Sequence, residues 1–530
     1  MNWFAIITFV VILTSIYIYA YVRSRKVDIS NSEGYFLGGR SLVGTTVGMS
    51  IIMTNLSTEH LVGQNGQSYV AGMEVMAWEV TAAIAIVIGA WVFIPKYFKY
   101  GVNTISDFIE IRFDTTTKRI VSILFMFTFV VSFMPVVLYS GALIFNNLFN
   151  IDEFLGVSSI TAAAIIAFII GAIGVSYLIL GGLSLLAHSD SIYGIGLIGG
   201  GLVVAALALF VLGDSNFLRG IDTIITQTPE KLNAWGAVDS AIVPWPTLFF
   251  GMLFNNLYFW CTNQMIIQKS LAAKNLKEAQ KGMIYVGFFK ISGAFFLVLP
   301  GIIAFNMFGG DLHMDSAYPA LISEILPGWA AGIFAAVVFG AIMSSFVGAL
   351  NATVTLFSLD FYKPVINKKA SSQDIARMGR FATIGFGLLT IIIAPFISIF
   401  PQGLFAVVQE FNGLYSMPLL AIVLVGFYSR KTSSLGAKVT FAFHVVTYAS
   451  SKLLIPDIHY LYVWSVLFLL DLAILVAFSK LRPEKDDFEF EKYKNKVDIT
   501  PWKHVRVTGI LILILVAAMY IVFSPLVLAK

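Results

Sequence analysis

Charged residues are scarce in this sequence: Asp, Glu, Lys and Arg make up 12% of its 530 residues, against about 25% in soluble globular proteins. The single cysteine, Cys261, excludes an internal disulfide and a cysteine-ligated metal cluster. The six histidines form no HExxH motif and no serine lies in a GxSxG motif, so two common hydrolase signatures are missing. Hydrophobic residues instead make up 58% of the chain. This balance indicates a protein of the membrane interior and argues against an enzyme.

Long apolar runs separated by short polar breaks extend along the whole chain. A bilayer crossing takes about 20 predominantly apolar residues, and a helix pairs every backbone amide within the lipid. We therefore predict an all-α polytopic membrane protein with 14 transmembrane helices and no extramembrane segment long enough for an enzyme domain. The predicted spans are 3–21, 41–70, 72–97, 118–147, 158–181, 190–213, 246–270, 280–306, 328–362, 373–399, 403–428, 434–455, 459–480 and 506–528.

Lysine and arginine predict the orientation, because cytoplasmic loops of membrane proteins are enriched in both. If the N-terminus is outside, the cytoplasmic loops and adjoining helix ends hold 29 of the 34 basic residues. Lys290 then falls within a membrane span. We expect a multi-pass protein of the plasma (inner) membrane with both termini extracytoplasmic. Residues 3–21 lack a basic start and are followed by basic residues, so they are expected to be a retained helix.

The second predicted helix, 41–70, carries the polar run TNLSTEH near its middle. A charge at membrane depth costs about 2.5–3.5 kcal/mol on insertion scales, so such a run needs a reason. A helix that unwinds around Asn55, Leu56 and Ser57 supplies one, because transporters use freed carbonyl groups of broken helices to bind cations. A continuous helix whose polar face packs against the bundle is the alternative.

Four polar residues on other helices fall at a similar depth, about 10–15 Å from a membrane surface at 1.5 Å per helical residue. They are Glu79, Asn256, Lys290 and Gln409. A solute site in the middle of the membrane requires such a convergence, and Trp78 offers a ring face beside Glu79. The alternative is that Glu79 only neutralises the charge of Lys290.

Sodium requires a small cage of oxygen atoms, which carbonyl and hydroxyl groups supply. Ala341, Ser344 and Ser345 are spaced i, i+3 and i+4, so they share one face of the predicted helix 328–362. Small hydroxyl residues also join helices in membranes, which leaves a packing role open. The spacing supports a sodium site only if this face meets the break in 41–70.

Five stretches of the chain resemble the sodium/solute symporter family, and within it the sodium–glucose and sodium–galactose cotransporters. They are YFLGGRSL, TNLSTEHLVG, YLILGGLSLLAHSD, NNLYFWCTNQMIIQKSLAAKNLKEAQKG and AIMSSFVGALNATVTLFSLDFY. The resemblance implies one transporter domain over 1–530. Within it, 3–21 would be a leading helix, 41–428 a LeuT-type core of two inverted five-helix repeats, and 434–528 three additional helices.

The resemblance also implies roles for individual residues. The sodium site would use the carbonyl groups of Met53, Leu56 and Ala341 and the hydroxyl groups of Ser344 and Ser345. The solute would be bound by His60, Glu79, Asn256, Lys290, Gln409, Trp78 and Trp260. The gates would be formed by Gln64, Phe259, Phe405 and Asn55. Asp190 matches an aspartate linked to ion release toward the cytoplasm.

Two positions depart from the pattern of the sugar carriers. Phe259 stands where a tyrosine is usual, so a hydroxyl group expected to bond Asn55 is lost. Ala82 replaces a serine that contacts sugar in the galactose carrier. The remaining sugar-type residues are intact, which favours a hexose or inositol over proline, pantothenate or sialic acid.

The resemblance implies a secondary active transporter that couples inward Na⁺ movement to uptake of a small polar solute by alternating access. The expected solute is a monosaccharide of the galactose or glucose type, with Na⁺ as the transported coupling ion. Membrane lipids surround the protein, and neither nucleic acid nor an obligate protein partner is expected. Several alternatives stay open: a carrier of inositol or sialic acid, a proton-driven carrier using Glu79, Asp190 or His60, and a sugar sensor or sodium-leak channel.

Overall fold

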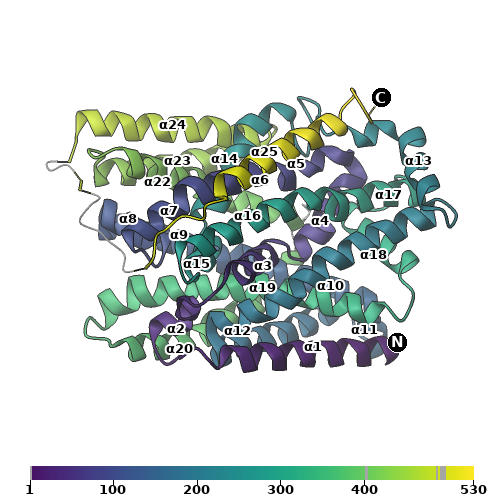
Figure 1. Cartoon of the computed structure of the whole chain (residues 1–530), viewed down its shortest axis with the longest axis horizontal. Coiled ribbons are helices and arrows are strands. Elements are labelled where there is room, and N and C mark those ends of the chain that lie inside the picture. The colour runs from purple at the N-terminus through teal and green to yellow at the C-terminus, as the bar shows by residue number, and fades with distance from the viewer. Residues whose placement is uncertain (1–2, 400–403, 485–487, 490–496, 530) are drawn as a thin grey trace.

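The chain folds into a bundle whose longer helices run roughly along the longest dimension of the molecule (Figure 1). The computed structural model describes residues 3–399, 404–484, 488–489 and 497–529, with only the backbone described for 404–406. Within these ranges the regular elements are helices, and no strand is formed. The predicted all-α class is therefore confirmed for the described part of the chain.

In chain order, the α-helices form a first set in the N-terminal half and a second set in the C-terminal half. The first set is α1 (Trp3–Ser24), α2 (Ser32–Leu37), α3 (Gly44–Asn55), α4 (Thr58–Ala71), α5 (Ala77–Val80), α6 (Ala82–Ile88), α7 (Ile94–Tyr100), α8 (Ile105–Arg112), α9 (Thr115–Thr128), α10 (Met134–Phe149), α11 (Ile151–Leu155), α12 (Ser159–Leu212) and α13 (Phe217–Gln227). The second set is α14 (Gly251–Thr262), α15 (Gln264–Leu271), α16 (Leu276–Gly293), α17 (Leu299–Phe308), α18 (Met314–Ile325), α19 (Ala331–Leu356), α20 (Ser372–Ile393), α21 (Leu404–Asn412), α22 (Ser416–Tyr428), α23 (Ser434–Leu454), α24 (Tyr460–Leu481) and α25 (Val505–Val522).

Short π-helical turns join helices that act as one longer rod. They connect α6 to α7, α9 to α10 and α16 to α17, and a fourth extends α19 to Ile366. By length and composition alone, nine helical segments of the described ranges are long and apolar enough to cross a membrane. Breaks and tight turns keep this number below the predicted fourteen, since α12 alone contains two of the predicted spans.

Helix α12 is 54 residues long, or about 80 Å at 1.5 Å per residue, whereas a bilayer core is about 30 Å thick. Gly182 interrupts it with φ 56° and ψ −154°, a backbone conformation that residues other than glycine rarely adopt. A Cβ atom there would lie 2.6 Å from the carbonyl oxygen of Tyr35. The loop predicted at 182–189 is therefore wrong: a single glycine makes the turn, and residues 183–189 are helical.

Three of the predicted membrane spans are broken near the polar positions that mark them. Leu56 and Ser57 are extended between α3 and α4, which confirms the predicted break in 41–70. Asn263 is extended between α14 and α15, where its side chain accepts a hydrogen bond from the backbone N–H of Met265. Asparagine is a favoured helix N-cap, so the sequence itself restarts the helix there. Residues 413–415 separate α21 from α22.

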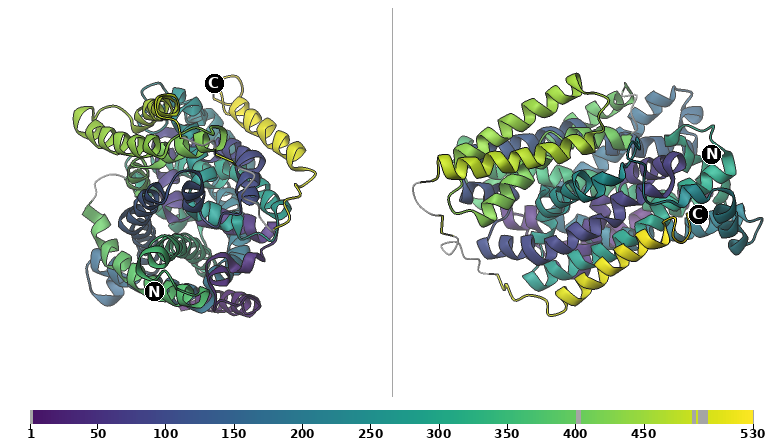
Figure 2. Two further views of the ribbon diagram at one scale, coloured as in Figure 1. Left: turned by 90° about the vertical axis from the view of Figure 1, so that its left-hand side faces the viewer. Right: turned by 90° about the horizontal axis from the view of Figure 1, so that it is seen from above.

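The first broken helix lies at the centre of the bundle. Helix α3 packs against α12, α16 and α19, and nine of its twelve residues are buried. Helices α1, α24 and α25 lie at the periphery, as two perpendicular views show (Figures 1 and 2). Both views also place the start of α1 and the end of α25 at the same end of the bundle. The breaks therefore place backbone ends and polar side chains inside the protein and away from lipid.

Candidate functional site

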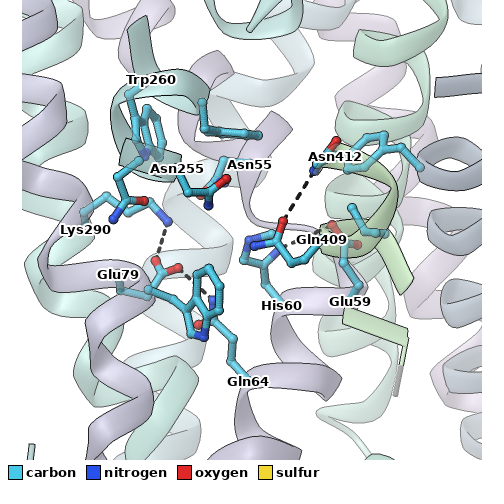
Figure 3. Close-up of a pocket in the computed structure, with 15 residues that line it drawn as sticks. Asn55, Glu59, His60, Gln64, Glu79, Asn255, Trp260, Lys290, Gln409 and Asn412 are labelled. Carbon is cyan, nitrogen blue, oxygen red and sulfur yellow. Dashed lines mark hydrogen bonds and ion pairs between the residues drawn. The ribbon is translucent and has the colours of Figure 1, made fainter. Parts of the chain in front are cut away.

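A cavity of about 50 Å³ lies beside the break between α3 and α4. Its walls come from α3, α4, α5, α14, α16 and α21 and from the turn between α9 and α10, and several of these segments are far apart in the sequence (Figure 3). The lining residues are Asn55, Glu59, His60, Gln64, Trp78, Glu79, Phe133, Asn255, Asn256, Phe259, Trp260, Lys290, Val408, Gln409 and Asn412. All seven residues predicted to bind solute are among them.

One wall of the cavity is built around a buried ion pair. Lys290 Nζ lies 2.5 Å from Glu79 Oε2, and each side chain is 1% exposed. Gln64 Nε2 donates a hydrogen bond of 3.0 Å to the other carboxylate oxygen, Oε1. Gly293, one turn after Lys290, leaves room for this carboxylate, since a Cβ atom there would lie 3.0 Å from Glu79. The carboxylate is thus held by two partners at the cavity wall, as Figure 3 shows.

The opposite wall presents a second carboxylate and a set of amides (Figure 3). Glu59 Oε1 lies 3.2 Å from His60 Nδ1, while Glu59 Oε2 accepts no hydrogen bond from any described residue. Asn412 Nδ2 donates a hydrogen bond of 3.4 Å to Gln409 Oε1. The two amides lie one turn apart on α21, so this helix brings both of them to the cavity.

Helix α14 contributes amides and aromatic rings. Asn256 Nδ2 donates a hydrogen bond of 2.8 Å to Thr81 Oγ1. The ammonium group of Lys290 lies 5.2 Å from the centre of the Trp260 ring, which itself packs edge-to-face on Phe259. A cation at this distance from a tryptophan face is favourable. The ring therefore helps to hold Lys290, and Trp260 also lines the cavity.

The predicted gate residues take different positions. Gln64, Asn55 and Phe259 all line the cavity, and the oxygen of the Asn55 side chain accepts no hydrogen bond from the described residues. Phe259 has no hydroxyl group to offer it. The side chain of Phe405 lies outside the described residues.

The helix that carries the predicted sodium-binding hydroxyl groups meets the broken helix. Ser345 Oγ donates a hydrogen bond of 2.9 Å to the carbonyl oxygen of Thr54 and lies 3.4 Å from that of Met53. Ser344 Oγ lies 3.2 Å from Thr54 Oγ1. Ala341, Ser344 and Ser345 are fully buried. Ser344 and Ser345 of this face therefore contact the end of α3, next to the break.

Asp190, on α12, contacts α3 and is not among the residues that line the solute cavity. Its Oδ2 accepts a hydrogen bond of 2.6 Å from Ser50 Oγ and lies 3.1 Å from Lys269 Nζ. Asp190 is fully buried and Lys269 is 1% exposed. Lys269 belongs, by sequence, to the basic residues that predict the cytoplasmic side. Its burial corrects that interpretation: this lysine points into the bundle and not toward the loop.

Sequence reasoning missed several residues that the structure brings to these two places. Glu59, Asn255 and Asn412 line the cavity, and all three belong to polar stretches that interrupt apolar helices. Thr54 and Lys269 flank the Ser344–Ser345 face. A threonine in a helix and a lysine near a helix end are ordinary residues in a membrane protein, so neither carries a sequence signal.

Several known proteins are similar in sequence to this chain. Residues 35–442 match the sodium:solute symporter family. The chain belongs to this family. It is 38% identical over 521 residues to the "Uncharacterized symporter YidK" of Escherichia coli, and this match covers 98% of this chain and 91% of the relative. It is 31% identical over 437 residues to the sodium/glucose cotransporter of Vibrio parahaemolyticus, with 78% of each chain covered. It is 25% identical to sodium/myo-inositol cotransporter 2 of Mus musculus, over 78% of this chain and 64% of the relative.

Solved structures show the same fold. A Na⁺-coupled sialic acid symporter in a substrate-bound outward-open state superimposes with a TM-score of 0.77 at 18% identity, over 91% of this chain and 99% of that one. The nucleobase-cation-symport-1 family transporter MHP1 gives 0.56 at 13% identity, over 88% and 99%. The chain therefore has a LeuT-like, all-helical transporter fold.

Family membership establishes the general activity. The chain is an integral membrane protein that moves a small solute together with Na⁺, which is its coupling ion. It is a transporter and not an enzyme.

Proposed function

We propose that this symporter carries a neutral, polyhydroxylated solute, a monosaccharide of the glucose or galactose type. The observation that carries this proposal is the cavity lined by Glu79, Lys290, Gln64, Asn256 and Gln409. Carboxylate oxygens accept strong hydrogen bonds from hydroxyl groups when water is excluded, and amides both donate and accept. Such a set suits a ring of hydroxyl groups, each of which donates one bond and accepts others.

The charges of the cavity favour a neutral solute over an anionic one. Two carboxylates, Glu59 and Glu79, line it together with one lysine, Lys290, which is already paired with Glu79. A solute carboxylate would meet Glu59 Oε2, which accepts no hydrogen bond from the described residues, and the described lining offers it no unpaired lysine or arginine. Like charges in a desolvated site repel strongly. Sialic acid, proline and pantothenate all carry a carboxylate, so we expect the cavity to exclude them.

Within this proposal the solute is contacted by His60, Glu79, Asn256, Lys290, Gln409, Trp78 and Trp260. Trp78 and Trp260 offer ring faces to the apolar face of a sugar, as aromatic residues do in other ligand cavities. Gln64, Trp78 and Phe405 would close the outer side, and Phe259 and Trp260 the inner side, with Asn55 beside them.

Sodium would bind between the broken helix and α19. Its ligands would be the carbonyl groups of Met53, Leu56 and Ala341 and the hydroxyl groups of Ser344 and Ser345. The contacts of Ser345 Oγ with the carbonyl oxygens of Thr54 and Met53 support this, because they bring hydroxyl and carbonyl oxygens together at the end of α3. Asp190 would act after binding, on the path of the ion toward the cytoplasm.

Sodium in this position couples the two transport steps. Bound there, it would draw α3 and α19 together and so hold the break in the shape that the solute cavity needs. Rocking of the bundle around the site would then expose both ligands to the cytoplasm, as in other carriers with broken helices. Because binding linkage is reciprocal, sodium raises the affinity for solute and solute raises the affinity for sodium.

The proposed architecture is one domain over 1–530 with fourteen membrane-spanning helices. Its core, 41–428, would consist of two inverted five-helix repeats between the leading helix 3–21 and three helices in 434–528. Two observations support it. The first membrane-spanning helix of each proposed repeat is broken, α3–α4 in the first repeat and α14–α15 in the second. The outer ends of α1 and α25 lie at one end of the bundle, as an even number of crossings requires (Figure 2). The protein would lie in the inner membrane, with both termini on its extracytoplasmic side.

The deciding experiment is uptake by the purified protein in liposomes with an imposed sodium gradient. Labelled glucose, galactose, myo-inositol, sialic acid and proline are compared at equal concentration. Accumulation of a hexose above equilibrium, abolished when choline replaces sodium, is expected. Accumulation of inositol alone would reassign the solute, and accumulation of sialic acid or proline would contradict the charge argument.

Other functions on the same scaffold predict different results in this assay. A proton-driven carrier would accumulate solute without sodium when a pH gradient is imposed. A sensor would bind sugar without accumulating it, and a sodium-leak channel would pass ²²Na⁺ without solute. Any of these three outcomes would overturn the proposed sugar symport.

A further inference from the structure

A buried lysine lies against the proposed sodium site, and none of the steps above uses it. Lys269, on α15, extends its ammonium group into the space between α3, α12 and α19. The ammonium donates a hydrogen bond of 2.8 Å to the carbonyl oxygen of Ser50 and lies 3.1 Å from Asp190 Oδ2. It also contacts the hydroxyl group of Thr54. All three of its partners are oxygen atoms, as a cation requires.

A short chain of contacts links this ammonium group to the hydroxyl groups of α19. Thr54 Oγ1, which contacts Lys269, lies 3.2 Å from Ser344 Oγ. The carbonyl oxygen of the same threonine accepts the hydrogen bond from Ser345 Oγ. The Ser344 side chain also interacts with Asp190. One residue, Thr54, therefore separates the lysine from the proposed cage, and Asp190 is shared by both.

The neighbouring helix leaves room for this lysine. Gly348 lies one turn beyond Ser344 on α19, and a Cβ atom there would come within 3.2 Å of Thr54 Oγ1 and 3.8 Å of Lys269 Cε. A glycine at this place lets Thr54 and the lysine stem lie against the α19 backbone. The packing, and not only the charge, thus fits a lysine in this position.

We propose that Lys269 is a tethered cation that competes electrostatically with sodium. Its ammonium group takes up part of the negative potential of Asp190 and of the carbonyl groups at the end of α3, so it weakens sodium binding at the adjoining cage. The proposal rests on the proposed sodium site at Ser344 and Ser345 and adds a residue that sets its affinity.

The sign of the effect follows from elementary electrostatics. Two like charges separated by several ångströms in a buried site repel by more than the thermal energy, even at an effective dielectric constant of about 20. Sodium bound at the cage meets this repulsion, which falls when sodium leaves. The lysine therefore favours ion release toward the low-sodium side, while Asp190, shared between the two cations, keeps the vacated site neutral.

The experiment measures sodium affinity without transport. Equilibrium ²²Na⁺ binding to the purified protein in detergent, without solute, gives a Kd for wild type, Lys269→Met, Asp190→Asn and the double variant. We expect Lys269→Met to bind sodium about tenfold more tightly than wild type. Asp190→Asn should bind it more weakly, and the double variant more tightly than Asp190→Asn alone. Lys281→Met, which removes a lysine paired with Glu278 near the protein surface, is the matched control.

The double variant keeps the test decisive if Lys269→Met fails to fold, because neither charge is then left unpaired. Lys269→Arg, which retains a cation at this place, should lack the tightening. The proposal would be overturned if removal of the lysine left sodium binding unchanged or weaker both in the wild-type protein and in the Asp190→Asn variant. Failure of the sodium site itself would look different: Ser345→Ala would then leave the wild-type Kd unaltered.

Discussion

His444 Nε2 donates a hydrogen bond of 2.9 Å to the carbonyl oxygen of Gly413, in the break between α21 and α22. Its other ring nitrogen lies 2.8 Å from Asp471 Oδ2 on α24, and all the side-chain atoms involved are buried. The C-terminal helices therefore hold the end of the helix that brings Gln409 and Asn412 to the cavity. Helices α23 and α24 have no residue among those that line the cavity, but through this contact they help to position α21.

Replacing His444 with phenylalanine should weaken solute binding through α21. The change leaves a buried carbonyl group and a buried carboxylate without their partner, which costs about 1–3 kcal/mol. We expect lower thermal stability and a several-fold higher KM for solute, with a smaller change in the sodium concentration for half-maximal uptake. His504→Phe, at an exposed position before α25, is the control. Equal effects on KM from both variants would show that the contact does not position α21.

The Glu79–Lys290 pair can be tested by comparing single and double variants. Breaking a buried ion pair from one side leaves an uncompensated charge and typically costs 3–5 kcal/mol, whereas removing both charges costs much less. Glu79→Gln and Lys290→Met should each lower the unfolding temperature more than the double variant does. All three should lose most uptake activity, because both residues line the cavity. Single variants as stable as the double variant would contradict a buried pair.

Replacing Ser345 with alanine should raise the sodium concentration for half-maximal uptake about tenfold, since a bond to a charged group is worth about 1.5–3 kcal/mol. The maximal rate at saturating sodium should fall less. Ser15→Ala serves as the control, because that hydroxyl group donates its hydrogen bond within α1, to the carbonyl oxygen of Val11. A proportional loss of rate at every sodium concentration would argue for a role in packing instead.

Phe259→Tyr should restore a partner for Asn55. Both residues line the cavity, and the Asn55 side-chain oxygen accepts no hydrogen bond from the described residues. A new hydrogen bond is worth about 0.5–1.5 kcal/mol, so we expect a modestly higher unfolding temperature or a lower KM. The gain should vanish in an Asn55→Ala background. Phe254→Tyr, on the same helix but packed against Phe468, controls for the added hydroxyl group.

Labelling of introduced cysteines tests the orientation. The natural Cys261 is buried, so wild-type protein should react little with a membrane-impermeant maleimide. In intact cells Ala237→Cys, exposed in the segment between α13 and α14, should react, whereas Lys369→Cys, exposed before α20, should react only after the membrane is opened. The reverse pattern would invert the predicted topology.

The sequence predicted the fold well where hydrophobicity decides it and poorly where single residues do. Long apolar runs and the scarcity of charge indicated a helical membrane protein, and the polar run around Leu56 indicated the break between α3 and α4. The turn at Gly182 was missed, because Ser184 and His188 look like loop residues but lie in a helix. A tight turn by one left-handed glycine leaves no compositional signal.

The candidate site shows a similar division. Polar residues at membrane depth are expensive, so Glu79, Asn256, Lys290 and Gln409 stood out from their helices, and the structure brings them into one cavity. Depth does not reveal which way a side chain points. Lys269, near a helix end, counts by sequence among the basic residues of the cytoplasmic side, although its side chain is buried.

The turn at Gly182 joins the two halves of α12 without slack. Asp190 lies only eight residues beyond it, about 12 Å along the helix. A connecting loop would absorb a tilt of one helix against the other. Here the change must occur in the two backbone dihedrals of one glycine, where even a Cβ atom would lie 2.6 Å from the carbonyl oxygen of Tyr35. Displacement of Asp190 relative to the first half of α12 is thus reduced to rotation about a single pivot. Any movement of α3 or α15 that pulls on Asp190 can therefore reach the first half of α12 along the chain only through this one glycine.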